Sequence, residues 1–152
     1  PPRSTLFPYT TLFRSEKMSL ENADFFSRVA FYKKQAMLFD LVILDAPFFS
    51  TTRKGVVDLA NQSIRLVNKV RPLLKDGGRL VVVNNALFLS GEDFYQSMQN
   101  LSQDGYLSIE NIIPIPEDIT GYPHTVVKSP PIDPSPFNHP TKILVLRVKR
   151  KQ

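Results

Sequence analysis

Short apolar runs recur along the chain and predict strands. Residues 39–45 (FDLVILD) and 78–85 (GRLVVVNN) are rich in β-branched residues, and residues 142–148 (KILVLRV) share this composition. Residues 108–115 (SIENIIPI) make a fourth candidate. Runs with apolar residues on both strand faces are typical of parallel sheets that are buried on both sides.

Helical patterns separate these runs. We predict a helix over residues 27–37 and a longer one over residues 54–74, in which apolar residues recur at roughly helical spacing. Pro72 is expected to bend or end the longer helix. Ser90 is a good N-cap residue, and Asp93 three positions later makes a variant of the capping box, so a third helix is predicted to begin there.

The order of these elements predicts an α/β fold. Strands that alternate with helices form a parallel sheet with helices packed on it. The last two strands are joined by the proline-rich residues 116–140, with no helical crossover, which favours an antiparallel last strand. A loop of this length in a compact domain is usually functional or disordered.

The first fifteen residues do not belong to this pattern. Residues 1–15 (PPRSTLFPYTTLFRS) match a reading-frame translation of a common short-read sequencing adapter. They have neither the apolar core of a signal peptide nor the pattern of a transit peptide, and we exclude them from the fold as an artefact. The protein is therefore expected to start at or before Glu16, with its true N-terminal part missing.

Composition narrows the class of protein without naming a partner. Without Arg3 and Arg14, the formal net charge falls from +5 to +3. Much of the remaining excess lies in residues 147–151, where a nucleic-acid contact and a solvated basic terminus are both compatible with it. The chain has no cysteine, so it has no disulfide and no thiolate ligand. Its apolar runs are too short to span a bilayer, and we expect a cytoplasmic protein, or an organellar one if the source is eukaryotic.

Two stretches carry a resemblance to a known family. FDLVILDAPFFS and LLKDGGRLVVVNNALFLSGEDF together resemble the second half of a class I, Rossmann-like methyltransferase that uses S-adenosylmethionine (SAM). They are most similar to the bacterial ribosomal RNA large-subunit methyltransferases, which carry an Asp-Pro-Pro-x-Phe type motif and a Leu-x-x-Gly-Gly turn. The resemblance covers residues 22–152. It implies that residues 16–152 are the C-terminal part of a catalytic domain, whose glycine-rich loop and ribose-binding acid lie in a missing N-terminal half.

The resemblance implies a cofactor role for residues before the first helix. In the family, an acid at the place of Asp24 accepts a hydrogen bond from the adenine amine, and an apolar residue at the place of Phe25 packs on the ring. Asp45 is expected on the cofactor side as well. Asp24 has an alternative role as a helix cap, which is a common use of aspartate.

The same resemblance assigns catalysis to Asp45, Ala46, Pro47 and Phe48. The carboxylate and the carbonyl of the second residue would hold a target amine toward the methyl group, and the aromatic residue would stack on a flipped base. Transfer is an in-line displacement, so positioning carries much of the catalysis. Ala46 replaces the first proline of the family motif, which keeps the carbonyl and loses rigidity. The alternative is an ordinary strand end with a proline stop.

Substrate contacts are expected on the same edge of the sheet. Asn84 and Asn85 end the following strand, where they would bind substrate or satisfy loop backbone groups. Phe49 and Lys54 follow the catalytic motif, and Lys54 would contact phosphate or be solvated. The absence of cysteine from the sequence argues against covalent cytosine chemistry.

The two histidines do not favour a metal site. His124 and His139 lie apart in the proline-rich loop and have no clustered acids nearby in the sequence, so surface roles are favoured for both.

The resemblance implies methyl transfer from SAM to a nucleic-acid base, with ribosomal RNA as the expected substrate and partner, and we expect no membrane contact. One alternative is a methyltransferase that acts on a protein or small molecule, and another is a non-catalytic, methyltransferase-like RNA-binding subunit. We also expect residues 16–152 alone to be poorly soluble and not to bind SAM, because residues 39–44 would form a bare, apolar sheet edge.

Overall fold

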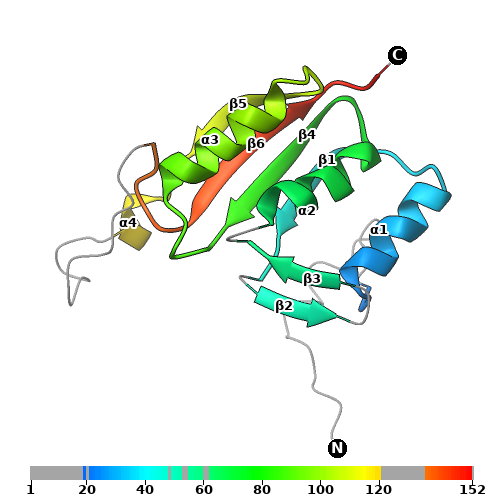
Figure 1. Cartoon of the computed structure of the whole chain (residues 1–152), viewed down its shortest axis with the longest axis horizontal. Helices are drawn as coiled ribbons and strands as arrows, with labels where there is room; N and C mark the ends of the chain where they lie inside the picture. The colour runs from blue at the N-terminus through cyan, green and yellow to red at the C-terminus, as the bar shows by residue number, and fades with distance from the viewer. Residues whose placement is uncertain are drawn as a thin grey trace, which may run out of the picture.

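The structure, a computed structural model, describes residues 19, 21–47, 49–52, 55–59, 62–120 and 136–151. Four strands form one sheet in the order β1-β4-β6-β5, and two short strands form a separate hairpin (Figure 1). The strands are β1 (Phe39–Asp45), β2 (Phe49–Thr52), β3 (Gly55–Asp58), β4 (Leu74–Asn84), β5 (Leu107–Ile113) and β6 (Lys142–Val148). The helices are α1 (Phe25–Lys34), α2 (Ser63–Val70), the short 3-10 helix η2 (Arg71–Leu73), α3 (Gly91–Ser102) and α4 (Glu117–Thr120).

The sheet is mixed, with a single reversed strand. β1 pairs with β4 in parallel, whereas β6 pairs antiparallel with both β4 and β5. β1, β4 and β5 therefore run in one direction and β6 runs in the other. The predicted α/β class with an antiparallel last strand is confirmed, and β1 and β6 have the boundaries that the sequence predicts.

β4 begins earlier than predicted because a glycine lets the strand bend. Leu74 lies opposite Phe39, and the next regular pairs begin with Leu41 opposite Arg79, so the register shifts between them. Gly77 has a φ of 73° in this stretch, a conformation that costs glycine little and other residues more. The glycine pair that predicts a turn before the strand therefore marks an irregularity inside it.

The predicted helix over residues 54–74 is wrong over Gly55–Asp58, which form the strand β3. β3 pairs antiparallel with β2, and the helix α2 begins only at Ser63. The apolar residues of this stretch do face one core, but Val57 reaches it from the hairpin and Leu66 reaches it from the helix. A β-branched pair after Gly55 suits a strand, and packing of the hairpin against α1 overrides the apparent helical period. A Cβ built on Gly55 would lie 2.6 Å from Cε2 of Phe26, so only glycine fits there without a shift.

The helix starts agree better with their capping signals. Ser90 is the N-cap of α3, as the sequence predicts, and its Oγ accepts a hydrogen bond from the Asp93 amide at 3.0 Å. Pro72 lies in η2, which ends the α2 segment as expected for a proline at that place. The proline-rich loop, predicted without structure, contains the short helix α4.

Three helices cover one face of the sheet. Figure 1 shows α1, α2 and α3 on the same side, and alternate residues of β4 and β6 pack beneath them. The fully buried apolar side chains of this layer are Leu66, Val67, Leu80, Val82, Phe94, Met98, Leu144 and Leu146. Burial of such side chains is the main favourable term in folding, at about 1.5–3 kcal/mol each.

The opposite face is open, which corrects the expectation that β1 is buried on both sides. Leu41 is 51% exposed and Ile43 is 63% exposed. Val81 and Val145, which continue the row of Ile43 across the sheet, are half-buried. Within the described residues no helix packs on this face, and β1 has no strand neighbour on its outer side.

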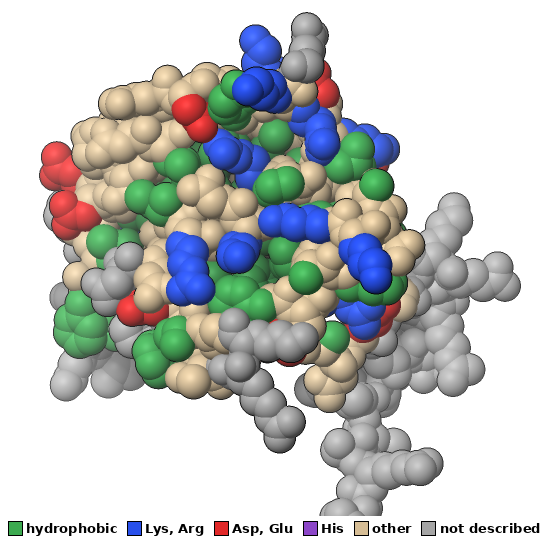
Figure 2. Space-filling model, turned by 45° about the vertical axis from the view of Figure 1, so that its right-hand side comes forward, with side chains coloured by type: hydrophobic (Ala, Val, Ile, Leu, Met, Phe, Trp, Pro, Cys, Tyr) green, Lys and Arg blue, Asp and Glu red, His purple; other side chains and the backbone are tan. Residues whose placement is uncertain are grey.

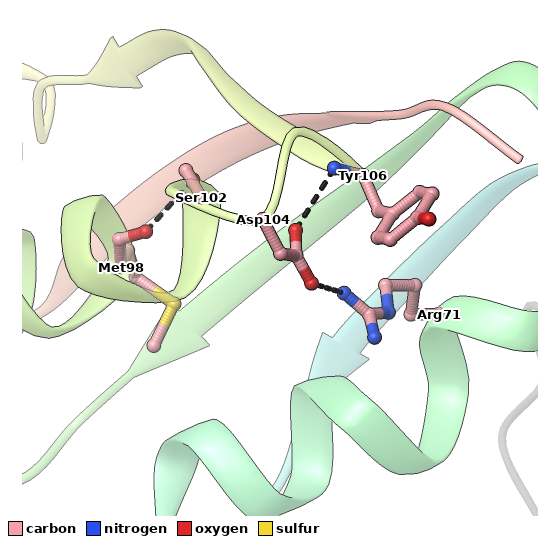
Figure 3. Close-up of polar contacts among 5 residues, drawn as sticks. All are labelled: Arg71, Met98, Ser102, Asp104 and Tyr106. Atoms are coloured by element: carbon pink, nitrogen blue, oxygen red, sulfur yellow. Dashed lines mark hydrogen bonds and ion pairs between the residues drawn. The ribbon is translucent and has the colours of Figure 1, made fainter. Parts of the chain in front are cut away.

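Polar contacts close the far corner of the sheet. Arg71 donates from Nη1 to Oδ2 of Asp104 at 2.9 Å, and the Tyr106 amide donates to Oδ1 of the same carboxylate at 2.8 Å (Figure 3). The basic terminus is tied to this end as well. Arg150 donates to the carbonyls of Leu74 and Pro72 and, from its amide, to Asp76. Part of the basic excess of the terminus therefore serves the fold.

None of the helices in the described ranges has both the length and the apolar composition that a membrane crossing requires.

Candidate functional site

The parallel pairing of β1 and β4 brings the predicted site residues to one edge. Asp45 ends β1 opposite Val83, and β4 ends one residue later at Asn84. The side-chain amide of Asn85 lies 3.5 Å from Oδ1 of Asp45, at the limit of a hydrogen bond. Asp45 and Asn85 are both exposed, so this polar pair faces outward at the carboxyl ends of the strands, where open α/β sheets bind ligands.

A cavity of about 640 Å³ lies beside this edge. Its walls come from the start of α1, from β1 and from the inner side of α2, and they are mainly apolar. Four predicted site residues line it: Phe25, Asp45, Ala46 and Pro47. This volume is typical of a pocket for a small organic ligand. The structure thus brings Phe25 next to the strand-end motif, 20 residues later in the sequence.

Asp24 has the capping role that the sequence analysis gave as its alternative. Oδ1 of Asp24 accepts hydrogen bonds from the amide and the hydroxyl of Ser27, each at 2.9 Å. This bond satisfies one of the amide groups that a helix start leaves unpaired. Its neighbours Ala23 and Phe25 line the cavity, so the cap fixes the backbone at the cavity wall. A contact of Asp24 with adenine stays a prediction.

Phe25 is held by a second aromatic ring. The rings of Phe25 and Phe26 meet edge to face, with centroids 5.1 Å apart and an angle of 78°. Phe26 in turn lies against Gly55 of the hairpin, and the Arg65 guanidinium lies 5.9 Å from the centre of its ring. The hairpin, α1 and α2 therefore meet at Phe26, immediately behind the cavity.

The two asparagines differ in role. Asn84 is fully buried, donates to the Leu59 carbonyl at 3.1 Å and accepts from the Ala86 amide at 2.8 Å. Its side chain satisfies backbone groups, which is one of the two alternatives that the sequence left open. Asn85 is the residue of the pair that remains available for a ligand.

Lys142 supports the loop after β4, a role that was not predicted from the sequence. Its side chain is fully buried, and Nζ donates to the carbonyls of Ala86 at 2.9 Å and Pro140 at 2.6 Å. A buried ammonium group requires such acceptors. The bond to Ala86 fixes the loop that carries Asn85. Strand alternation could have revealed it, because Lys142 shares the core-facing positions of Leu144 and Leu146.

The remaining predicted residues are divided between described and undescribed parts of the chain. Ala46 is half-buried and packs on the core, whereas Pro47 is exposed. Phe49 opens β2 and is 59% exposed. Phe48, Lys54 and His124 lie outside the described residues.

The described histidine has a local structural contact. Nδ1 of His139 accepts a hydrogen bond from the Thr141 amide at 3.1 Å. The neighbouring Asn138 holds Ile115 through both its amide oxygen and its amide nitrogen, at 2.9 Å each. Among the residues that the structure describes, no three His, Asp or Glu side chains gather closely enough to hold a metal ion.

Comparisons with known proteins support the fold. No protein-family model matches the sequence, and no curated protein matches it either. Among solved structures, SMU.776, assigned as a methyltransferase and solved with SAH, is 15% identical and gives a TM-score of 0.65. A protein from Streptococcus mutans, assigned as a SAM-dependent methyltransferase, is also 15% identical and gives a TM-score of 0.60.

Each of these two matches covers 83% of this chain and 30% of the neighbour, so the chain spans less than a third of either protein. Structural similarity at this low sequence identity shows a shared fold and does not transfer a function. The resemblance to class I methyltransferases is therefore confirmed as a resemblance of fold, with the Rossmann-like arrangement that the sequence predicts.

Proposed function

We propose that this chain is the C-terminal part of a catalytic domain that transfers a methyl group from SAM to a nucleic-acid base, with ribosomal RNA as the expected substrate. The observation that carries this proposal is the cavity of about 640 Å³ that joins Phe25 to Asp45, Ala46 and Pro47. The cavity runs along β1 as far as the carboxyl end of that strand, in a fold shared with proteins assigned as methyltransferases.

The lining of the cavity fits an adenosyl group. Phe25 offers an aromatic wall, the buried side chains of Leu44 and Leu66 supply apolar surface, and the Asp45 carboxylate supplies acceptors. Such a mixture of apolar walls and a few placed polar groups is typical of cofactor pockets. SAM, when bound, supplies a sulfonium methyl group that is already activated for transfer.

The chain's own groups would position the acceptor. The Asp45 carboxylate and the Ala46 carbonyl would accept hydrogen bonds from the target amine and so aim its lone pair. The Asn85 amide, 3.5 Å from Oδ1 of Asp45, would hold the carboxylate in place. The exposed ring of Phe49, two residues after Pro47, offers a face for base stacking. Catalysis of this kind depends on orientation more than on proton transfer.

The remainder of the domain is expected to pack on the open side of the sheet. Ile43 and Leu41 are exposed apolar residues on an edge strand, which ordinarily invites pairing with another strand. We therefore expect the preceding residues of the complete protein to supply strands beside β1, and a glycine-rich turn with an acid about 20 residues further on. Sequencing of the source DNA upstream of the codon for Glu16 tests this directly.

Methyl transfer is tested on the protein that this sequencing yields. SAM binding is measured by calorimetry, and transfer of a radiolabelled methyl group is measured with ribosomal RNA transcripts. Asp45→Asn is expected to lower kcat by roughly 10²-fold, because the amine loses its orienting carboxylate. It should also weaken SAM binding, because the same carboxylate lines the cofactor cavity. Asp118→Asn, an exposed aspartate on α4, is the matched control and should keep full activity.

Each other outcome points to a different protein. Transfer to a protein or small molecule instead of RNA would replace the substrate class and keep the enzyme. SAM binding without transfer to any acceptor would favour a non-catalytic RNA-binding subunit. A complete protein that does not bind SAM at all would remove the proposal.

A further inference from the structure

A basic groove lies between α1 and α2, apart from the candidate cavity. It encloses about 590 Å³ and is lined by Lys33, Gln62, Ile64, Arg65, Asn68 and Lys69. We call it the α1–α2 groove. Figure 2 turns the α1 side of the molecule toward the viewer and shows many Lys and Arg side chains there, with few Asp or Glu side chains among them.

The cations of the groove have no acidic partner among the described residues. Elsewhere on the described chain, basic side chains pair with acids, as Arg71 does with Asp104 and Arg79 with Glu110. In the described ranges, no carboxylate pairs with Lys33, Lys69 or Arg65. Arg65 donates to the Gln62 side chain instead, at 2.6 Å. Since these charges form no ion pair with the described residues, we treat them as available to an external anion.

The two lysines also repel one another. Partial burial lowers the pKa of Lys33, and the nearby ammonium group of Lys69 lowers it further. An anion between the two lysines would relieve this repulsion. The Asn68 and Gln62 amides add neutral hydrogen-bond donors to the same groove, as a phosphate oxygen requires.

The groove leads toward the candidate site. The Arg65 guanidinium lies over the ring of Phe26, and Phe26 packs edge to face on Phe25 at the cavity wall. From Gln62 to Lys69, the helical rise gives a length of about 10 Å. That length accommodates about two or three successive phosphates of one strand.

We propose that the α1–α2 groove binds the phosphate backbone of the RNA strand whose target base enters the candidate site. The inference rests on the proposed function and deepens it. Lys33 and Lys69 contact phosphates at the far end of the groove, and Arg65 contacts the backbone nearest the cavity. Phosphate contacts of this kind fix register and orientation without reading sequence.

The test measures how RNA binding depends on salt. The monomeric fraction of the full chain is titrated into a fluorescein-labelled, twelve-nucleotide single-stranded RNA, and fluorescence anisotropy gives Kd over a range of salt concentrations. For single strands, each phosphate contact adds about 0.7 to the slope of log K against log salt. The double variant Lys33→Gln, Lys69→Gln should therefore lose about 1.4 from the slope and bind roughly 25-fold more weakly at 0.1 M salt.

A charge-matched control isolates the groove. Lys149→Gln with Lys151→Gln removes the same two charges from the exposed C-terminal end. The control should bind RNA within about threefold of the unchanged chain, because it leaves both groove lysines in place. Equal loss in the two double variants would overturn the proposal, and so would an unchanged chain that does not bind RNA at low salt. An acidic peptide of equal charge that binds as tightly as the RNA would assign the groove to a protein partner instead.

Failure of this inference is distinguishable from failure of the proposed function. SAM binding to the complete protein reports on the cavity and should not change in the groove variant. Loss of RNA binding in that variant supports the groove even if methyl transfer is never observed. Methyl transfer that remains, with RNA binding unaffected by the groove variant, would keep the enzyme and remove the groove.

Discussion

The two edges of the sheet differ in how completely they are packed. At the β5 edge, α3 buries Phe94 and Met98 fully, and Arg71 and Tyr106 hold the Asp104 carboxylate from two elements (Figure 3). At the β1 edge, Ile43 is 63% exposed on the open face of the sheet. The same sheet therefore has one closed side and one open side.

This difference separates the residues that hold the fold from those that form the site. Buried apolar contacts raise the free energy needed for local opening, whereas exposed segments open easily. The candidate cavity lies at the β1 edge, between β1 and the helices α1 and α2, and the exposed Asp45 is among its lining residues. We infer that the β4-β6-β5 part stabilises the chain and that the β1 edge contributes its ligand-binding groups.

The largest expected effect comes from a substitution on the closed side. Phe94→Ala should lower the free energy of unfolding by about 3–5 kcal/mol, because a fully buried ring leaves a cavity. Ile43→Ala on the open side should cost less than about 1 kcal/mol, because most of the side chain is already in water. Urea unfolding followed by circular dichroism measures both. Equal losses would mean that the two edges are equally packed in solution.

The next largest effect tests the buried lysine at the start of β6. Lys142→Met keeps most of the apolar stem and removes the ammonium group, so the carbonyls of Ala86 and Pro140 lose a donor. Unsatisfied buried acceptors should lower the free energy of unfolding by about 2–3 kcal/mol. Lys149→Met, at an exposed position, is the matched control and should change stability little. A stability gain in Lys142→Met would show that the buried charge is a net cost.

A smaller effect is expected where the hairpin meets α1. Gly55→Ala would place its Cβ 2.6 Å from Cε2 of Phe26, and the shift this requires should cost about 1–2 kcal/mol. Phe26→Leu removes the obstructing ring atoms. The loss of unfolding free energy in the double variant should therefore be smaller than the sum of the two single-variant losses. The difference, measured in a double-mutant cycle, should be at least about 0.5 kcal/mol. Simple additivity would mean that the hairpin does not pack on Phe26.

The smallest effect concerns pH on the closed side. The hydrogen bond from the Tyr106 amide lowers the pKa of Asp104, and Arg71 lowers it further. A carboxylate whose folded pKa is depressed stabilises the fold above its unfolded pKa, and this stability is lost as pH falls through the folded value. Asp104→Asn should therefore lower the urea midpoint at pH 7 and converge with the unchanged chain in acid. A constant difference at all pH values would assign the effect to packing.

The sequence predicted the sheet better than the segments that leave it. β1 and β6 were predicted to the residue, because their β-branched runs allow no other element. The hairpin was missed, because its apolar residues and those of α2 face the same core and so imitate one long helix. The contact between Gly55 and Phe26 favours a strand over a helix for residues 55–58. These two residues lie far apart in the chain.

The candidate site shows the same division. Parallel pairing alone predicts that Asp45 and Asn85 meet at one edge, and the structure brings them within 3.5 Å. Strand alternation places Asn84 with Leu80 and Val82 on the core-facing side of β4, which separates it from Asn85. The partner of Asn84, the Leu59 carbonyl, depends on a contact between distant parts of the chain. Strand alternation indicates that Lys142 is buried, whereas the residue type indicates exposure, because lysine is rarely buried.

The enclosed amine of Lys142 has a practical consequence for labelling chemistry. An acylating reagent in water reaches the other described lysines directly, but it reaches Nζ of Lys142 only when β6 separates from the loop at Ala86. The acylation rate of this amine, measured by mass spectrometry, then reports how often the sheet opens under native conditions. A ligand that covers the β1 edge would lower this acylation rate without contacting Lys142.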